Sequence, residues 1–103
     1  MQRPTEIMCG GTGPASEPSE EVHNICKAVK SDVEAKTNKS YGVFKPVSVR
    51  TQVVAGTNYF IKVLVDESAG EHVHLRVWGK LDGTHELTSC QENKSAVDPL
   101  EYF

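Results

Sequence analysis

The chain has 103 residues, of which 24% are charged, and a formal net charge of -3, so we expect one domain with one modest core. Without a basic excess the chain is not suited to a phosphate backbone. No apolar stretch approaches the roughly 20 residues of a membrane helix, and residues 1–9 lack the apolar region of a secretory signal. We therefore expect neither a nucleic-acid partner nor a membrane partner.

The cysteine content favours a cytoplasmic protein. Three cysteines, Cys9, Cys26 and Cys90, cannot close a disulfide framework among themselves, and no C-x-x-C pair is present. Cys26 is expected to pack in the core. Cys9 lies in a glycine-rich segment, where oxidation could link two chains through it.

Residues 1–16 are predicted to form a flexible N-terminal trunk. Glycine and proline break any periodicity, and apolar residues occur in this segment only at Ile7, Met8 and Cys9, apart from Met1 and Ala15.

Residues 18–36 are predicted to form one helix. Pro18 suits a first helical turn, and Glu20 and Glu21 follow where negative charge meets the positive end of the helix dipole. Apolar residues then repeat with helical spacing on one face, at Val22, Ile25, Cys26, Val29 and Val33.

From residue 41 the apolar period becomes two, which predicts strands at about 41–53, 58–65, 72–78 and 86–92. Residues 66–70 form a predicted turn, and Asp82-Gly83 is a signal for a two-residue hairpin. Short connections imply an antiparallel meander with one apolar face, and the helix can cover that face. The expected fold class is therefore a two-layer α+β domain.

Residues 94–103 are predicted to form a C-terminal tail. Pro99 argues against a central strand. The apolar residues Leu100, Tyr102 and Phe103 are expected to anchor the tail against the domain, with an edge strand as one way of doing so.

The segment QVVAG at 52–56 lies at a predicted turn but is apolar, whereas turns favour glycine, asparagine, aspartate, serine and proline. One interpretation is an exposed apolar tip, which marks a contact surface. The other is that the strand continues to Ala55, with a bulge at Gly56.

Several segments together resemble a known family. QVVAG at 52–56 resembles the signature loop of cystatins, and TNYFIKV at 57–63, VHLRV at 73–77 and LEYF at 100–103 are similar to later segments of the stefin branch. MCG at 8–10 resembles the stefin N-terminal motif. The match runs in order from about residue 8 to residue 103 and is most similar to stefin B-like members.

This resemblance implies a single cystatin domain over residues 1–103, with one long helix packed across a curved four- to five-stranded antiparallel sheet. It implies a reversible, tight-binding competitive inhibitor of papain-like, cathepsin-type cysteine peptidases rather than an enzyme, with no cofactor and no metal. Three elements, the trunk and two hairpins, would form a wedge that fills the active-site cleft. The residues so assigned to peptidase binding are Met8, Cys9, Gly10, Gln52, Val53, Val54, Ala55, Gly56, Leu81 and Asp82.

The chain departs from the family pattern at the second hairpin, where Asp82 instead of proline follows Leu81 and the connection is shorter. Residues 1–7, which precede the trunk motif, are the other departure. Stefins are also prone to exchange segments between chains, so we expect a monomer that can form a domain-swapped or Cys9-linked dimer. Strain at Val53 and Val54 in a tight turn would favour that exchange.

Three alternatives compete with this interpretation. A Cys–His hydrolase would need a structured, electropositive pocket around one of the thiols. A metal site could use His72 and His74, which share one strand face, although solvated surface histidines are favoured there. The third is a non-inhibitory interaction module on the cystatin fold.

Overall fold

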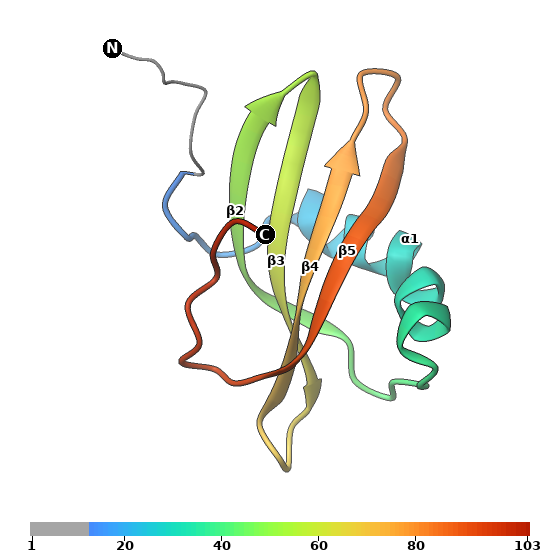
Figure 1. Ribbon diagram of the computed structural model, residues 1–103, viewed down its shortest axis with the longest axis vertical. Helices are drawn as coiled ribbons and strands as arrows, with labels where there is room; N and C mark the ends of the chain where they lie inside the picture. Colours follow the sequence, from blue (N-terminus) through green and yellow to red (C-terminus); the bar gives the residue numbers. More distant parts are fainter. Residues whose placement is uncertain (1–12) are drawn as a thin grey trace.

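The computed structural model describes residues 13–103, so the predicted contact residues Met8, Cys9 and Gly10 lie outside the described residues. The elements are the helix α1 (Glu20–Thr37) and the strands β2 (Lys45–Val54), β3 (Gly56–Asp66), β4 (Glu71–Gly79) and β5 (His85–Lys94). The strands form one antiparallel sheet in the order β2-β3-β4-β5 (Figure 1). The predicted α+β meander is confirmed.

Helix α1 begins two residues later than predicted. Ser19 is the N-cap, and its side chain accepts a hydrogen bond from the Val22 amide. Pro18 therefore precedes the cap instead of occupying the first turn. Asn38 ends the helix in the left-handed conformation, with φ of 59°, and its amide bonds to the Glu34 carbonyl oxygen.

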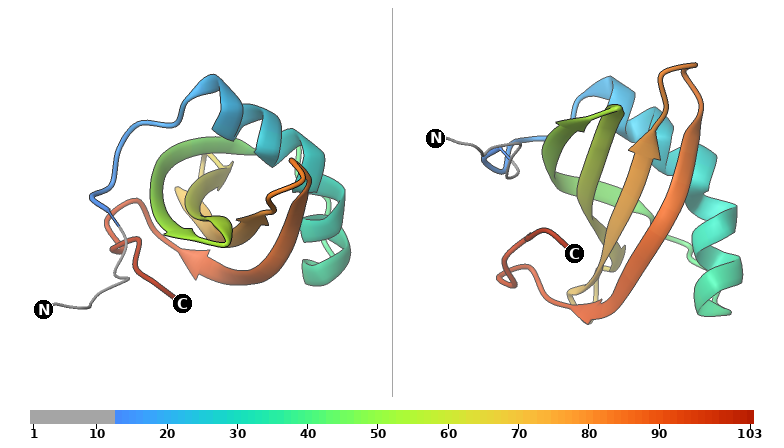
Figure 2. Two further views of the ribbon diagram at one scale, coloured as in Figure 1. Left: turned by 90° about the horizontal axis from the view of Figure 1, so that it is seen from above. Right: turned by 45° about the horizontal axis from the view of Figure 1, so that its top comes forward.

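The predicted helix stripe is confirmed as the face that packs on the sheet. All five of its residues are buried, and α1 lies against one face of the curved sheet (Figure 2). The sheet contributes alternate residues of its strands to the same core: Val49, Ile61, Val63, Val65, Val73, Leu75 and Val77. Burial raises the pKa of the Cys26 thiol to about 12, as expected for a core residue.

The first strand begins at Lys45 and not near residue 41. A register shift between Pro46 and Ser48 breaks the alternation, so that Pro46 and Val49 are buried while Val47 is only partly buried. Before the strand, Phe44 packs against the core. The regular alternation predicted from residue 41 onward is therefore wrong at its start.

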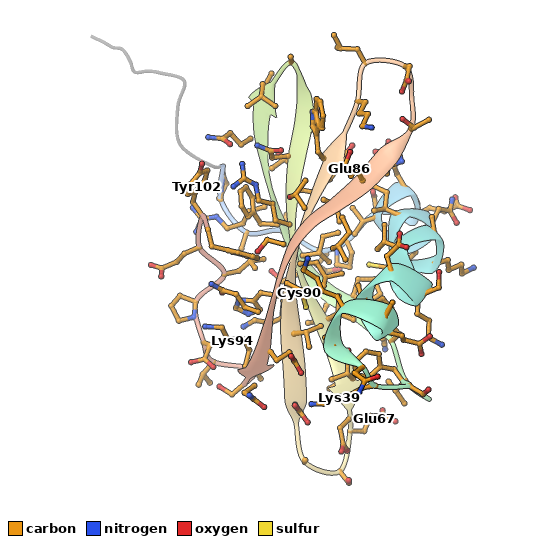
Figure 3. The ribbon with its side chains drawn as sticks, turned by 45° about the vertical axis from the view of Figure 1, so that its right-hand side comes forward. Lys39, Glu67, Glu86, Cys90, Lys94 and Tyr102 are labelled. Atoms are coloured by element: carbon orange, nitrogen blue, oxygen red, sulfur yellow. The ribbon has the colours of Figure 1, made fainter. Side chains whose placement is uncertain are left out.

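The C-terminal tail, residues 95–103, covers part of the other face of the sheet (Figure 2). Leu100 is buried, and the Phe60 ring of β3 contacts the rings of Tyr102 and Phe103 at 5.5 and 5.8 Å between centroids. Tyr102 lies on the side of the sheet away from α1 (Figure 3). The tail is anchored as predicted, but it forms no strand.

Cationic side chains on the sheet hold the tail through its backbone oxygens. Lys62 Nζ donates to the carbonyl oxygens of Ala96 and Asp98, at 2.7 and 2.5 Å. Further bonds of this kind run from Arg50 to the Leu100 oxygen, at 2.8 Å, and from Arg76 to the Phe103 oxygen, at 2.7 Å. Burial lowers the pKa of the Lys62 ammonium, so these carbonyls are important partners for it.

The prediction that His72 and His74 are solvated is wrong, because both are buried. His72 Nδ1 donates to the Gly70 carbonyl oxygen at 3.0 Å. His74 Nε2 is buried and has no hydrogen-bond partner among residues 13–103. Burial, aided by the nearby charges of Lys62 and Lys94, lowers the pKa of His74 to about 4. His74 is therefore neutral at pH 7.

Candidate functional site

Two hairpin tips lie at the same end of the sheet (Figure 1). The first joins β2 to β3 through Ala55, and the second joins β4 to β5 through residues 80–84. The connection from β3 to β4, residues 67–70, lies at the opposite end, as the meander requires. We refer to five exposed residues of the two tips, Val53, Val54, Ala55, Leu81 and Asp82, as the tip surface.

The first tip is apolar and exposed to solvent. Val53 is 78% exposed and Val54 is 41% exposed, although both belong to the end of β2. The two interpretations of this segment therefore both hold in part: the strand continues to Val54, and its end is an apolar tip. Apolar side chains held in water at a loop tip are typical of a contact surface.

Gly56 brings the first tip close to β4. Its φ is +97°, and a Cβ there would overlap the carbonyl oxygen of Gly79. Glycine is therefore required, because other residues would be strained and would separate the two backbones. Among the described residues other than glycine, positive φ occurs at Asn38 and Asn93. The predicted strain at Val53 and Val54 is therefore wrong.

The second tip presents Leu81, which is 83% exposed. The Gly83 amide bonds to the Lys80 carbonyl oxygen at 3.0 Å, so Leu81 and Asp82 are the central residues of the turn. Gly83 follows with φ of +93°. This is a turn followed by a left-handed glycine, so the predicted two-residue hairpin centred on Asp82-Gly83 is wrong.

Asp82 stabilises the second tip from within. Its Oδ1 accepts hydrogen bonds from the Thr84 hydroxyl, at 2.7 Å, and from the Thr84 amide, at 2.9 Å. These bonds lower the pKa of the Asp82 carboxyl. An aspartate thus organises the turn at the position where proline was expected from the family pattern.

Three residues that position the first tip were not found from the sequence. Asn58 is buried and donates from Nδ2 to Gln52 Oε1 at 3.0 Å, across the two strands that carry the tip. Trp78 and Gly79 reach the tip from β4. The available signal was the position of Trp78 and Gly79 at the end of a predicted strand, immediately before the second hairpin.

The described thiols are not suited to nucleophilic chemistry. Burial raises the pKa of the Cys90 thiol to about 11, and that of Cys26 is raised further, so both are protonated at neutral pH. In residues 13–103, no group of three or more His, Cys, Asp or Glu side chains is placed to hold a metal ion. Nor does any helix in this part of the chain have the length and apolar composition of a membrane span.

Comparisons with known proteins agree with this architecture. A family model described as the cystatin domain matches residues 10–97. Cystatin-B of Bos taurus is 45% identical over 100 residues, which cover 94% of this chain and 100% of the relative. Cystatin-B of Homo sapiens is 43% identical with the same coverage, and cystatin-B of Oplegnathus fasciatus is 43% identical over 94% of this chain and 98% of the relative.

Proposed function

The chain belongs to the cystatin family, and on that premise we propose that it is a reversible, tight-binding competitive inhibitor of papain-like, cathepsin-type cysteine peptidases and not an enzyme. The cystatin-B relatives match the chain over 94% of its length, so the resemblance includes both hairpins. The described thiols are protonated and buried or partly buried, which argues against a peptidase or hydrolase of its own.

The tip surface is the observation that carries the proposal. Val53 and Leu81 are apolar side chains held almost fully in water, one on each tip, at the same end of one sheet. Burying them in a cleft is favourable because it removes apolar area from water. The tips sit on a hydrogen-bonded sheet, so binding costs little ordering entropy there. A cleft filled in this way is blocked without a peptide bond being attacked.

The shape of the first tip also allows a peptidase to approach its backbone closely. The backbone at Gly56 carries no Cβ, and Ala55 is a small residue at the point of the bend. Gln52 supports the tip through its hydrogen bond with Asn58. We assign Val53, Val54 and Ala55 to direct contact with the peptidase, and Gln52 and Gly56 to the shape of the tip.

We assign Leu81 and Asp82 to the second contact, with Leu81 entering the cleft and Asp82 holding the turn. The trunk residues Met8, Cys9 and Gly10 are the proposed third contact, on the basis of the family motif alone. The proposed location is the cytoplasm, on the basis of the cysteine content. The proposed working state is a monomer, with a domain-swapped or Cys9-linked dimer as a second state.

Steady-state inhibition of papain tests the proposal. Raising the substrate concentration should relieve the inhibition in the manner of competition, and the same chain should leave trypsin, a serine peptidase, uninhibited. Inhibition that does not depend on substrate concentration would rule out occupation of the cleft. No inhibition of papain by folded, reduced monomer would favour a non-inhibitory interaction module instead.

A further inference from the structure

We propose that Trp78 is a positioning residue that holds the first hairpin tip in its binding conformation and fixes its distance from the second tip. The inference rests on the proposed function only for its consequence on peptidase binding. That Trp78 holds the first tip is proposed for the free chain, without a bound peptidase.

The indole of Trp78 reaches across strands to the first tip. Trp78 belongs to β4 and is paired in the sheet with Asn58 of β3. Its Nε1 donates a hydrogen bond of 2.9 Å to the carbonyl oxygen of Ala55. Ala55 is the residue between β2 and β3, and the ladder closes beneath it with the pair Val54 and Gly56. The bond therefore holds the bend itself and not the strands below it.

Gly56 leaves the room that the indole occupies. A Cβ on Gly56 would lie 3.2 Å from Trp78 Nε1, in addition to its overlap with the Gly79 carbonyl oxygen. Trp78 and Gly79 of β4 thus contact Ala55 and Gly56 of the first tip. The first tip is held to β4 by one directional bond and one close backbone approach.

The same indole also contacts the second tip. Lys80, which begins the second tip, places its Nζ 5.4 Å from the centroid of the Trp78 ring, an arrangement in which the cation is attracted to the ring face. Trp78 therefore has contacts with both tips. Because β4 leads directly into the second tip, the bond to Ala55 sets the spacing between the two parts of the tip surface.

The indole adjoins an open pocket beside the first tip. This pocket of about 310 Å³ is lined by Val54, Ala55, Asn58, Arg76, Trp78 and Thr88. The side chains on this side leave free space next to the tip, so packing there does not prevent the tip from moving. The hydrogen bond from Trp78 is for this reason the contact that restricts the bend on that side.

A tip that is already held in its binding conformation in the free chain loses less conformational freedom on binding. This favours a slower dissociation of the complex. Trp78 is the one tryptophan of the chain, so a tryptophan analogue supplied during expression enters at this position alone. In 3-benzothienylalanine a sulfur atom replaces the indole N–H while the size of the ring is kept. This analogue removes the bond to Ala55 and little else.

Two measurements test the proposal with this analogue. In the free chain, hydrogen exchange at the amides of residues 54–56 should become faster, while exchange in the core of β3 stays unchanged. In complex with papain, the dissociation rate should rise about two- to tenfold, the range expected for one net hydrogen bond. The association rate and the melting temperature should change little. Lys80→Met, which keeps the N–H, is the matched control and should leave exchange at residues 54–56 unchanged.

Unchanged exchange at residues 54–56 in the analogue would overturn the proposal, whatever the chain does to papain. The proposal would also fail if the analogue behaved as the natural chain in both assays while Trp78→Ala bound papain weakly, because the ring would then act by contact. If the natural chain does not inhibit papain, the proposed function fails, and the exchange measurement still decides whether Trp78 holds the tip.

Discussion

Leu81→Ala should weaken peptidase binding without destabilising the free chain. Leu81 is 83% exposed, so its side chain gains little from the folded monomer and can gain from a cleft. Fully burying a leucine side chain is worth about 1.5–3 kcal/mol, and about four-fifths of that remains available on binding. Allowing for the methyl group that alanine keeps, we expect a loss of about 1–2 kcal/mol.

This loss corresponds to a dissociation constant that rises about 5- to 30-fold. The assay is the inhibition constant for papain, obtained from progress curves over a range of inhibitor concentrations, together with the melting temperature of each free variant. The change in folding stability should stay within about 0.5 kcal/mol, as is usual for exposed positions.

Val97→Ala is the matched control for Leu81→Ala. Val97 is 89% exposed and apolar, but it lies in the tail that follows β5 and not on the tip surface. This variant should inhibit papain as the natural chain does. If Leu81→Ala gave the same inhibition constant as the natural chain, the second tip would make no contact, and the assignment of Leu81 and Asp82 would be wrong.

Three further predictions concern the first tip, the trunk and the tail. Gly56→Ala should reduce both affinity and stability by at least about 1 kcal/mol, because of its positive φ and the overlap with Gly79; Gly70→Ala, with positive φ but open space at the opposite end, should leave affinity unchanged. Deleting residues 1–10 should speed dissociation from papain at an unchanged melting temperature, since the hydrogen bonds of Gly13 and Ser16 to β2 are kept. Equal dissociation rates for the two chains would show that the trunk does not contact the peptidase. Burial depresses the pKa of His74 from 6.5 to about 4, so between these values the unfolded chain binds a proton that the folded chain does not. Stability should therefore fall as the pH drops from about 6.5 to about 4, and denaturant titrations of His74→Gln should show a flatter profile across that range; an unaltered slope would contradict this account.

The helix and the core face of the sheet could be predicted from periodicity. A helical stripe of five apolar residues has one way to be buried, and a run such as Ile61, Val63 and Val65 presents one apolar face. The start of β2 could not be predicted in this way. The register shift between Pro46 and Ser48 moves the following side chains to the opposite face of the strand. The alternation of apolar and polar residues does not indicate where this shift occurs.

The polar face of the sheet was predicted least well. His72 and His74 alternate with apolar residues and were therefore expected in water, yet both are buried, as is Lys62, which is paired with His74 in the sheet. The Lys62 ammonium donates hydrogen bonds to backbone oxygens of the tail. Every residue has a backbone oxygen, whatever its side chain. Patterns of side chains cannot reveal such partners.

The candidate site, like the fold, was predicted only in part from the sequence. The apolar sequence at 52–56 indicated an exposed tip, and Val53 and Val54 are exposed there. The contact that holds the tip comes from Trp78, 23 residues further along the chain. The proximity of Trp78 to Ala55 depends on the register of β3 with β4, which the sequence alone does not determine.

We propose that the tip surface occupies the active-site cleft of a papain-like peptidase. Titration of active papain with reduced, monomeric chain tests it most directly, followed by mass spectrometry of the recovered inhibitor. Activity should fall linearly to near zero at one chain per active site, and the recovered chain should be intact. Activity that persists in molar excess of the folded chain, or a chain cleaved at residues 52–56, would contradict the claim.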